Sequence, residues 1–244
     1  MKTLPLLLKR EYWEHRGGFL WAPVWVCAVI LIVTVLGIIS AEVFSSSSHV
    51  QMGFALDDLR KNMSAGDLTL TSGAMQLFDG EFEFNVPALK PAIAYTVDGT
   101  TGLLKVSQGS AAGNYENKWQ LTLDETTPVE LHITLGAGDA RLTLGRMNLQ
   151  SVDVRLGAGD LVLDLRGMPA GSYPVSVNAG AGDTTIRMPA AVGISARTFG
   201  LIGDATMTGL EKRDDRWINP RAASPVTIDV RIQHAIGDLT LIAE

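Results

Sequence analysis

The chain of 244 residues has almost no cysteine, and one long stretch carries no charge. Cys27 is the only cysteine, so neither an internal disulfide nor a Cys-x-x-Cys metal or redox motif can form. No charged residue lies between Arg16 and Glu42. Lys and Arg number 20 against 26 Asp and Glu. The net charge of −6 offers no basic surface for nucleic acid, and no nucleic-acid partner is expected.

The uncharged stretch contains an apolar run of 22 residues, 19–40, which is long enough to cross a bilayer as a helix. A buried core helix is the alternative, and a cleaved signal peptide has a shorter apolar core of about 7–15 residues. Basic residues precede the run and none follows before Arg60, so the N-terminus is predicted to be cytoplasmic and the C-terminal part to lie outside. The preceding residues are Lys2, Lys9, Arg10 and Arg16.

Four parts are predicted along the chain. They are a cytoplasmic amphipathic segment (1–18), a transmembrane helix (19–41) that acts as an uncleaved signal anchor, a linker (42–63) and an extracytoplasmic domain (64–244). The serine run 45–48 is typical of a flexible linker. Residues 52–63 are expected to form either a short helix or no regular structure.

Apolar and polar residues alternate after residue 65, which predicts strands with one buried face. No segment beyond residue 64 has the period of an amphipathic helix. The outer domain is therefore predicted to be all-β. The clearest alternating segments are Val129–Leu135, Val152–Leu156, Leu161–Leu165 and Val226–Ile232.

A Gly-Asp pair recurs between these strands, with successive aspartates 21, 23 and 21 residues apart before a longer gap that holds the charged run EKRDDR. A period near 20 predicts stacked strand–turn–strand units, a single-chain β-solenoid. Glycine adopts positive φ freely, and aspartate hydrogen-bonds to nearby backbone, so the pairs are expected to form a column of structural turns. The pairs are Gly138-Asp139, Gly159-Asp160, Gly182-Asp183, Gly203-Asp204 and Gly237-Asp238, with an earlier copy at Gly66-Asp67.

The same aspartates suggest a second hypothesis, an acidic ladder that binds Ca²⁺ through Asp139, Asp160, Asp183, Asp204 and Asp238. Each turn supplies one carboxylate, whereas Ca²⁺ takes 6–8 oxygen ligands. The structural turn ladder is therefore the favoured interpretation. No cofactor is expected.

Catalytic motifs are missing from the sequence: it contains no G-x-S-x-G, no P-loop and no H-E-x-x-H. Its four histidines are scattered, and His132 and His234 are expected to be solvated strand residues. Glu81 and Glu83 alternate with Phe82 and Phe84, which predicts an outward carboxylate face and inward aromatic rings. An enzyme is therefore not expected.

The segment GEFEFNVP at Gly80–Pro87 resembles a motif of the bacterial toast-rack proteins. The resemblance continues through Asn117-Lys118-Trp119, the GAGD repeats and the terminal Ile236–Leu239, so it covers about 65–244. Related domains form the C-terminal part of LiaF-like cell-wall-active antibiotic response proteins. The resemblance implies a membrane-tethered β domain without enzyme activity, located at the bacterial inner (cytoplasmic) membrane.

A second resemblance concerns the first 40 residues or so. The segment KREYWEHRGGFLWAP is similar to the start of ABC-2-type transporter permeases, although the further membrane spans of a permease are missing here. Two protein partners follow as expectations: a sensor kinase of an envelope-stress response, or a component of an ABC transporter. Self-association as an adhesin-like structural protein is a third hypothesis, because open ends of stacked strands can pair.

Overall fold

The computed structural model describes residues 53–54, 58–99, 101–109, 111, 115–200, 202–220 and 222–244. The chain divides into two compact units, Met1–Ser48 and His49–Glu244, and all described residues belong to the second. The predicted amphipathic segment 1–18 and transmembrane helix 19–41 lie outside the described residues. Within the described part, no helix has the length and apolar character needed to cross a bilayer.

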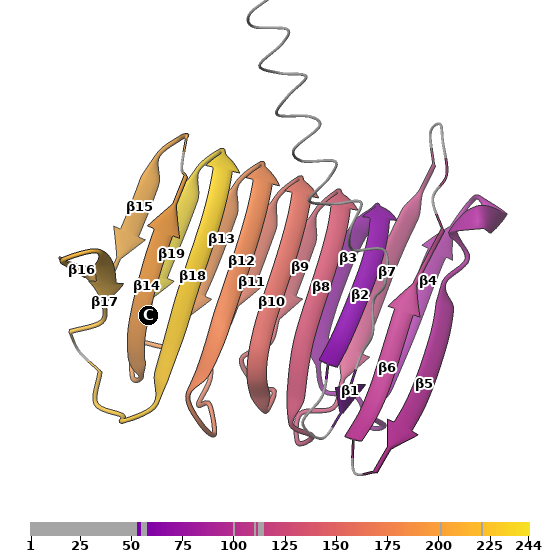
Figure 1. The fold of residues 1–244 in the computed structure, drawn as a ribbon, viewed down its shortest axis with the longest axis horizontal. Coiled ribbons are helices and arrows are strands. Elements are labelled where there is room, and N and C mark those ends of the chain that lie inside the picture. Colours follow the sequence, from indigo (N-terminus) through magenta and orange to yellow (C-terminus); the bar gives the residue numbers. More distant parts are fainter. Residues whose placement is uncertain are drawn as a thin grey trace, which may run out of the picture. The chain divides into compact units, whose positions relative to one another are not determined.

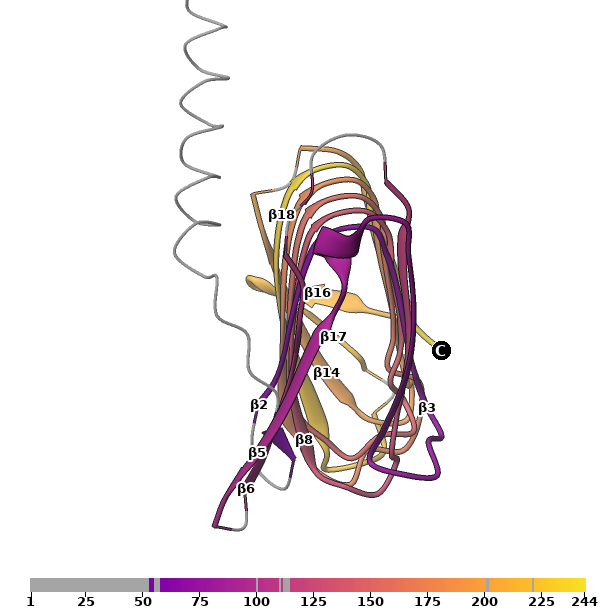
Figure 2. The same ribbon diagram turned by 90° about the vertical axis from the view of Figure 1, so that its right-hand side faces the viewer.

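The described unit consists of two β-sheets and a single 3-10 turn, η1 (Pro87–Leu89), which confirms the all-β prediction. An 11-stranded sheet, here called sheet A, faces an 8-stranded sheet B (Figures 1 and 2). Sheet A contains β1 (Gly53–Phe54), β2 (Asp58–Ala65), β5 (Ala92–Asp98), β6 (Thr101–Ser107), β8 (Val129–Ala137), β10 (Leu149–Ala158), β12 (Tyr173–Ala181), β14 (Gly193–Phe199), β16 (Glu211–Arg213), β17 (Arg216–Ile218) and β18 (Thr227–Ile236). Sheet B contains β3 (Asp67–Ser72), β4 (Phe78–Phe84), β7 (Asn117–Leu123), β9 (Ala140–Thr143), β11 (Leu161–Asp164), β13 (Thr184–Met188), β15 (Ala205–Thr208) and β19 (Leu239–Ala243).

The chain passes repeatedly from a strand of sheet A through a Gly-Asp turn into a strand of sheet B. β8 leads into β9, β10 into β11, and β12 into β13, and each strand pairs in parallel with the equivalent strand of the next unit. The stacking order departs from the chain order near the C-terminal end. The last unit, β18–β19, lies between β12–β13 and β14–β15, as Figure 1 shows.

The core lies between the sheets and follows directly from the alternation. In β8 the four apolar residues Val129, Leu131, Ile133 and Leu135 are buried, whereas the residues between them are partly exposed. Burying an aliphatic side chain of this size stabilises the fold by about 1.5–3 kcal/mol. Trp119 of β7 is fully buried and meets the Phe82 ring edge-to-face, with ring centroids 5.3 Å apart.

Residues 53–54 and 58–63, predicted to belong to the linker as a short helix or without regular structure, form strands β1 and β2 instead. β2 pairs in parallel with β8 over its length, for example Met63 with Leu135, and Met63 is buried. The polar stretch Asp58–Asn62 carries little alternation, which is why the sequence did not reveal a strand there. Its partners on both sides, β6 and β8, provide the pairing.

Candidate functional site

The Gly-Asp pairs lie in register and form a single column of turns. The backbone N–H of Asp160 donates to Asp139 Oδ1 at 3.0 Å, and the N–H of Asp183 donates to Asp160 Oδ1 at 2.9 Å. The column continues out of chain order. The N–H of Asp238 donates to Asp183 Oδ1 at 2.9 Å, and the N–H of Asp204 donates to Asp238 Oδ1 at 3.0 Å. Each of these four carboxylates therefore holds the turn stacked upon it.

The glycines allow the turns to stack at close distance. Gly159 has a φ of 123°, and a Cβ atom added there would lie 2.1 Å from the carbonyl oxygen of Gly138. No side chain fits at that distance, and the φ value is one that L-residues rarely adopt. The same combination of positive φ and close contact with a backbone carbonyl recurs at Gly66, Gly138, Gly182, Gly203 and Gly237.

One oxygen of the Asp139, Asp160, Asp183 and Asp238 carboxylates is thus engaged by backbone, as a structural turn ladder requires. Within the described residues, no three His, Cys, Asp or Glu side chains are arranged to hold a metal ion. The Ca²⁺ hypothesis stays a prediction, and binding would need oxygens from several neighbouring turns.

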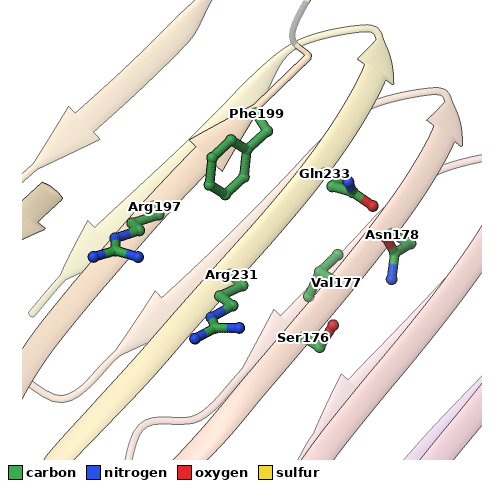
Figure 3. Close-up of a pocket in the computed structure, with 7 residues that line it drawn as sticks. All are labelled: Ser176, Val177, Asn178, Arg197, Phe199, Arg231 and Gln233. Carbon is green, nitrogen blue, oxygen red and sulfur yellow. The ribbon is translucent and has the colours of Figure 1, made fainter. Parts of the chain in front are cut away.

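A shallow hollow of about 380 Å³ lies on the outer face of sheet A, over β12, β18 and β14 (Figure 3). The strand register brings its residues together: Ser176 pairs with Arg231, Asn178 with Gln233, and Arg231 in turn with Arg197. Phe199 closes one side with its half-exposed ring, and Val177 of β12 completes the lining.

The hollow presents hydrogen-bond donors in excess. Arg197 Nε lies 3.1 Å from Asp215 Oδ2, in the turn between β16 and β17, so that its charge is paired. Arg231 has no ion pair with any described residue, and its side chain is exposed. Guanidinium, amide and hydroxyl groups beside an aromatic ring bind carboxylates, phosphates and hydroxyl-rich groups by charge-assisted and neutral hydrogen bonds.

A second polar cluster adjoins the hollow along the same face. His132 Nδ1 and Arg155 Nη2 lie 3.5 Å and 3.2 Å from Asp153 Oδ2. Burial works against the ionised form of Asp153, yet the hydrogen bonds and charges of His132 and Arg155 outweigh it and lower the pKa of this carboxyl. The cluster is therefore a paired, structural one. Arg231, by contrast, is an exposed cation of this face without an ion pair within the described part.

His234 differs from the prediction, because it is buried rather than solvated, with 2 % of its surface exposed. Its Nε2 donates to the carbonyl oxygen of Gly182 at 2.8 Å and so ties β18 to a neighbouring turn of the column. The alternation of Val226–Ile232 in fact places residue 234 on the inward face, opposite Ala179. This inward position in the alternation was the sequence signal that could have predicted the burial of His234.

The hollow itself was not found from sequence. Its residues come from three strands that are not consecutive in the chain, and β18 separates β12 from β14 only because the last unit inserts between them. Its lining side chains offer guanidinium, amide and hydroxyl groups, which form hydrogen bonds.

The geometry defines a two-sheet β protein with a structural turn column and a polar outer face. A family model described as the N-terminal domain of toast_rack, DUF2154, matches residues 56–187, more than half of the chain. The chain belongs to this family, as the GEFEFNVP segment and the GAGD repeats predicted.

Two solved structures are similar to this chain. A candidate cell adhesion protein from Clostridium sporogenes ATCC 15579 matches with a TM-score of 0.68 and 25% identity, over 75% of this chain and 91% of that chain. A candidate adhesin from Bacteroides fragilis NCTC 9343 matches with a TM-score of 0.23 and 14% identity, over 80% of this chain and 98% of that one. No curated protein matches the sequence.

Proposed function

We propose that this chain is a membrane-anchored, non-enzymatic binding module that contacts a protein partner through the outer face of sheet A. The observation that carries the proposal is the hollow around Arg231, where hydrogen-bond donors from three strands converge on a broad, regular sheet. Membership of the toast-rack family and the similarity to a candidate cell adhesion protein support a binding role.

The anchoring half of the proposal rests on the sequence. The apolar run 19–40 and its basic N-terminal flank would place the β domain outside the cytoplasmic membrane. The parallel strand–turn–strand units support its description as a β-solenoid, a stiff platform for a binding face. Protease added to intact spheroplasts should then digest residues 64–244 and spare the N-terminal epitope; the reverse pattern would contradict this topology.

The partner is expected to carry acidic or hydrogen-bond-accepting groups at the contact. Under this proposal, a sensor kinase of an envelope-stress response is the first candidate, and the module would modulate it by contact alone. An ABC transporter component is the second candidate, favoured by the permease-like segment KREYWEHRGGFLWAP. Both candidates are compatible with the same membrane anchor, so identification of the bound partner distinguishes them.

Affinity purification of the full-length tagged chain from gently solubilised membranes, followed by mass spectrometry, tests the proposal. Arg231→Ala should reduce the recovered partner at least tenfold, a loss of about 1.4 kcal/mol. The matched control is Arg141→Ala, because Arg141 is exposed on the outer face of sheet B. Enrichment of a kinase or of a transporter component decides between the candidates. Equal recovery with both variants would contradict the assignment of the hollow.

A further inference from the structure

Strand β5 stands out because all seven of its residues are exposed. Within the described residues it pairs with β6 alone and so forms an edge of sheet A (Figure 1). Ile93, Tyr95 and Val97 are 51, 51 and 62 % exposed, and we call these three residues the β5 stripe. Single exposed apolar residues are ordinary, but three in succession on one face of an edge strand form a patch.

The β5 stripe continues the core face of sheet A. Tyr95 lies opposite Leu104 of β6 and Ile93 opposite Val106, and both β6 residues are buried. The stripe therefore faces the side that elsewhere packs against sheet B. At this end of the molecule β4 is the last strand of sheet B, and it leaves the stripe uncovered. Figure 2 shows the β5–β6 hairpin extending away from the two stacked sheets.

The other long edge strand at this end, β4, carries protective charges. Asp79, Glu81 and Glu83 alternate along its exposed face. Two copies that paired antiparallel about Glu81 would bring Asp79 against Glu83 and Glu81 against itself, which like-charge repulsion opposes. In β5 the sole charged residue is Asp98, at the last position. β5 therefore lacks the usual protection of an edge strand.

We propose that β5 is a homodimerisation edge, where the β5 strand of a second copy pairs antiparallel with it. Pairing about Tyr95 sets Ile93 opposite Val97 of the second copy, and Asp98 opposite Ala92, so apolar side chains meet and no like charges face each other. The backbone groups on the free side of β5 gain partners, and the two β5 stripes cover one another.

A single strand pair is a small interface, below the roughly 1,200–2,000 Å² of stable complexes, so dimerisation should be weak and concentration-dependent. This inference goes beyond the proposed function and does not depend on it: it concerns the opposite end of sheet A from the hollow. A tether in the membrane would raise the effective concentration of the copies.

Sedimentation analysis of the full-length chain in detergent micelles, over a hundredfold range of concentration, tests the proposal. The wild type should shift from monomer to dimer. Tyr95→Lys and Tyr95→Glu should each weaken self-association at least tenfold, because like charges then meet at the centre of the pairing. An equimolar mixture of the two variants should restore a dimer with one copy of each.

The matched control is Thr206→Lys, which adds the same charge to β15, an exposed edge strand at the other end of sheet B, and should leave the dimer unchanged. Circular dichroism checks that each variant folds. A wild type that stays monomeric throughout would overturn the proposal, even where the stripe binds lipid vesicles or another segment instead. A dimer insensitive to both Tyr95 variants, or a mixture that fails to pair, would overturn it as well.

Discussion

Strands β8 and β5 share an alternating sequence pattern but differ in how far their residues are buried. Both alternate apolar with smaller or polar residues, VELHITLGA in β8 and AIAYTVD in β5. In β8 every second residue is buried, whereas in β5 all are exposed. β8 has β2 on one side, β10 on the other and sheet B across the core, whereas β5 pairs, among the described strands, with β6 alone.

The difference separates two properties that are easily confused. Alternation decides which side chains share a face of a strand, because successive Cβ atoms point to opposite sides. The number of neighbouring strands decides whether that face is covered. In this protein the interior units form hydrogen bonds with one another through the turn column. The β5 end keeps an apolar face that nothing in the described part covers.

Of the substitutions considered, one in the turn column should lower the free energy of unfolding the most. Gly159→Ala forces a Cβ atom against the Gly138 carbonyl oxygen at a φ of 123°. Backbone strain and overpacking together should cost about 4 kcal/mol. Urea denaturation of the full-length chain in detergent measures the change. Gly171→Ala is the control, since no atom lies near its added Cβ, and it should change little. Equal losses at both positions would contradict close stacking of the turns.

A pair of core and edge truncations tests the comparison between β8 and β5 directly. Leu131→Ala in β8 removes a fully buried side chain and should lower the free energy of unfolding by about 3 kcal/mol. Ile93→Ala in β5 should cost below about 1 kcal/mol at protein concentrations where the chain is monomeric, because half of the side chain is already in water. Similar losses for both would show that β5 is covered.

The aspartates of the column should stabilise through hydrogen-bond acceptance rather than through charge. Asp160→Ala removes the acceptor for the Asp183 N–H and should cost about 1 kcal/mol. Asp160→Asn keeps an oxygen at the same place and should cost less. Thermal melting with and without Ca²⁺ accompanies both variants, and a specific cation site would raise the wild-type midpoint by mass action. That rise, lost in Asp160→Asn, would favour the Ca²⁺ ladder.

The smallest effect concerns acid stability at the edge away from the Gly-Asp column. The Thr127 and Thr126 hydroxyls and backbone N–H groups lower the pKa of Asp124 from 3.8 to about 2. A depressed pKa contributes stability above the unfolded value of 3.8, and this stability is lost as the pH falls towards 2. Asp124→Asn should flatten the dependence of unfolding on pH between 4 and 2, measured by urea titration. An unchanged slope would contradict it.

Much of the fold could be predicted from the sequence, because it depends on local patterns of a few residues. The alternating segments became β8, β10, β11 and β18, and the Gly-Asp pairs became the turn column. The strand β2 was missed because its pairing depends on strands distant in the chain. The burial of His234 was missed although the local alternation places this residue on the inward face. Phe84, predicted to point inward, is 37 % exposed because β4 is the last strand of sheet B.

The candidate site was less accessible than the fold. Nothing near Arg231 in the sequence points to Arg197 or Asn178, and these residues meet because the β18–β19 unit inserts between β12–β13 and β14–β15. The sequence places each of them on an outward face of its strand. The combination of outward faces into a hollow is a property of the stacking order.

The sequence by itself determined the β class, the faces of the strands, the turns and the family, because period-two alternation and glycine turns are properties of a few adjacent residues. The tertiary structure alone decided which unit lies beside which, which apolar faces are covered and where polar side chains converge. Those outcomes depend on which distant strands pair, and the local sequence of one strand does not name its partner.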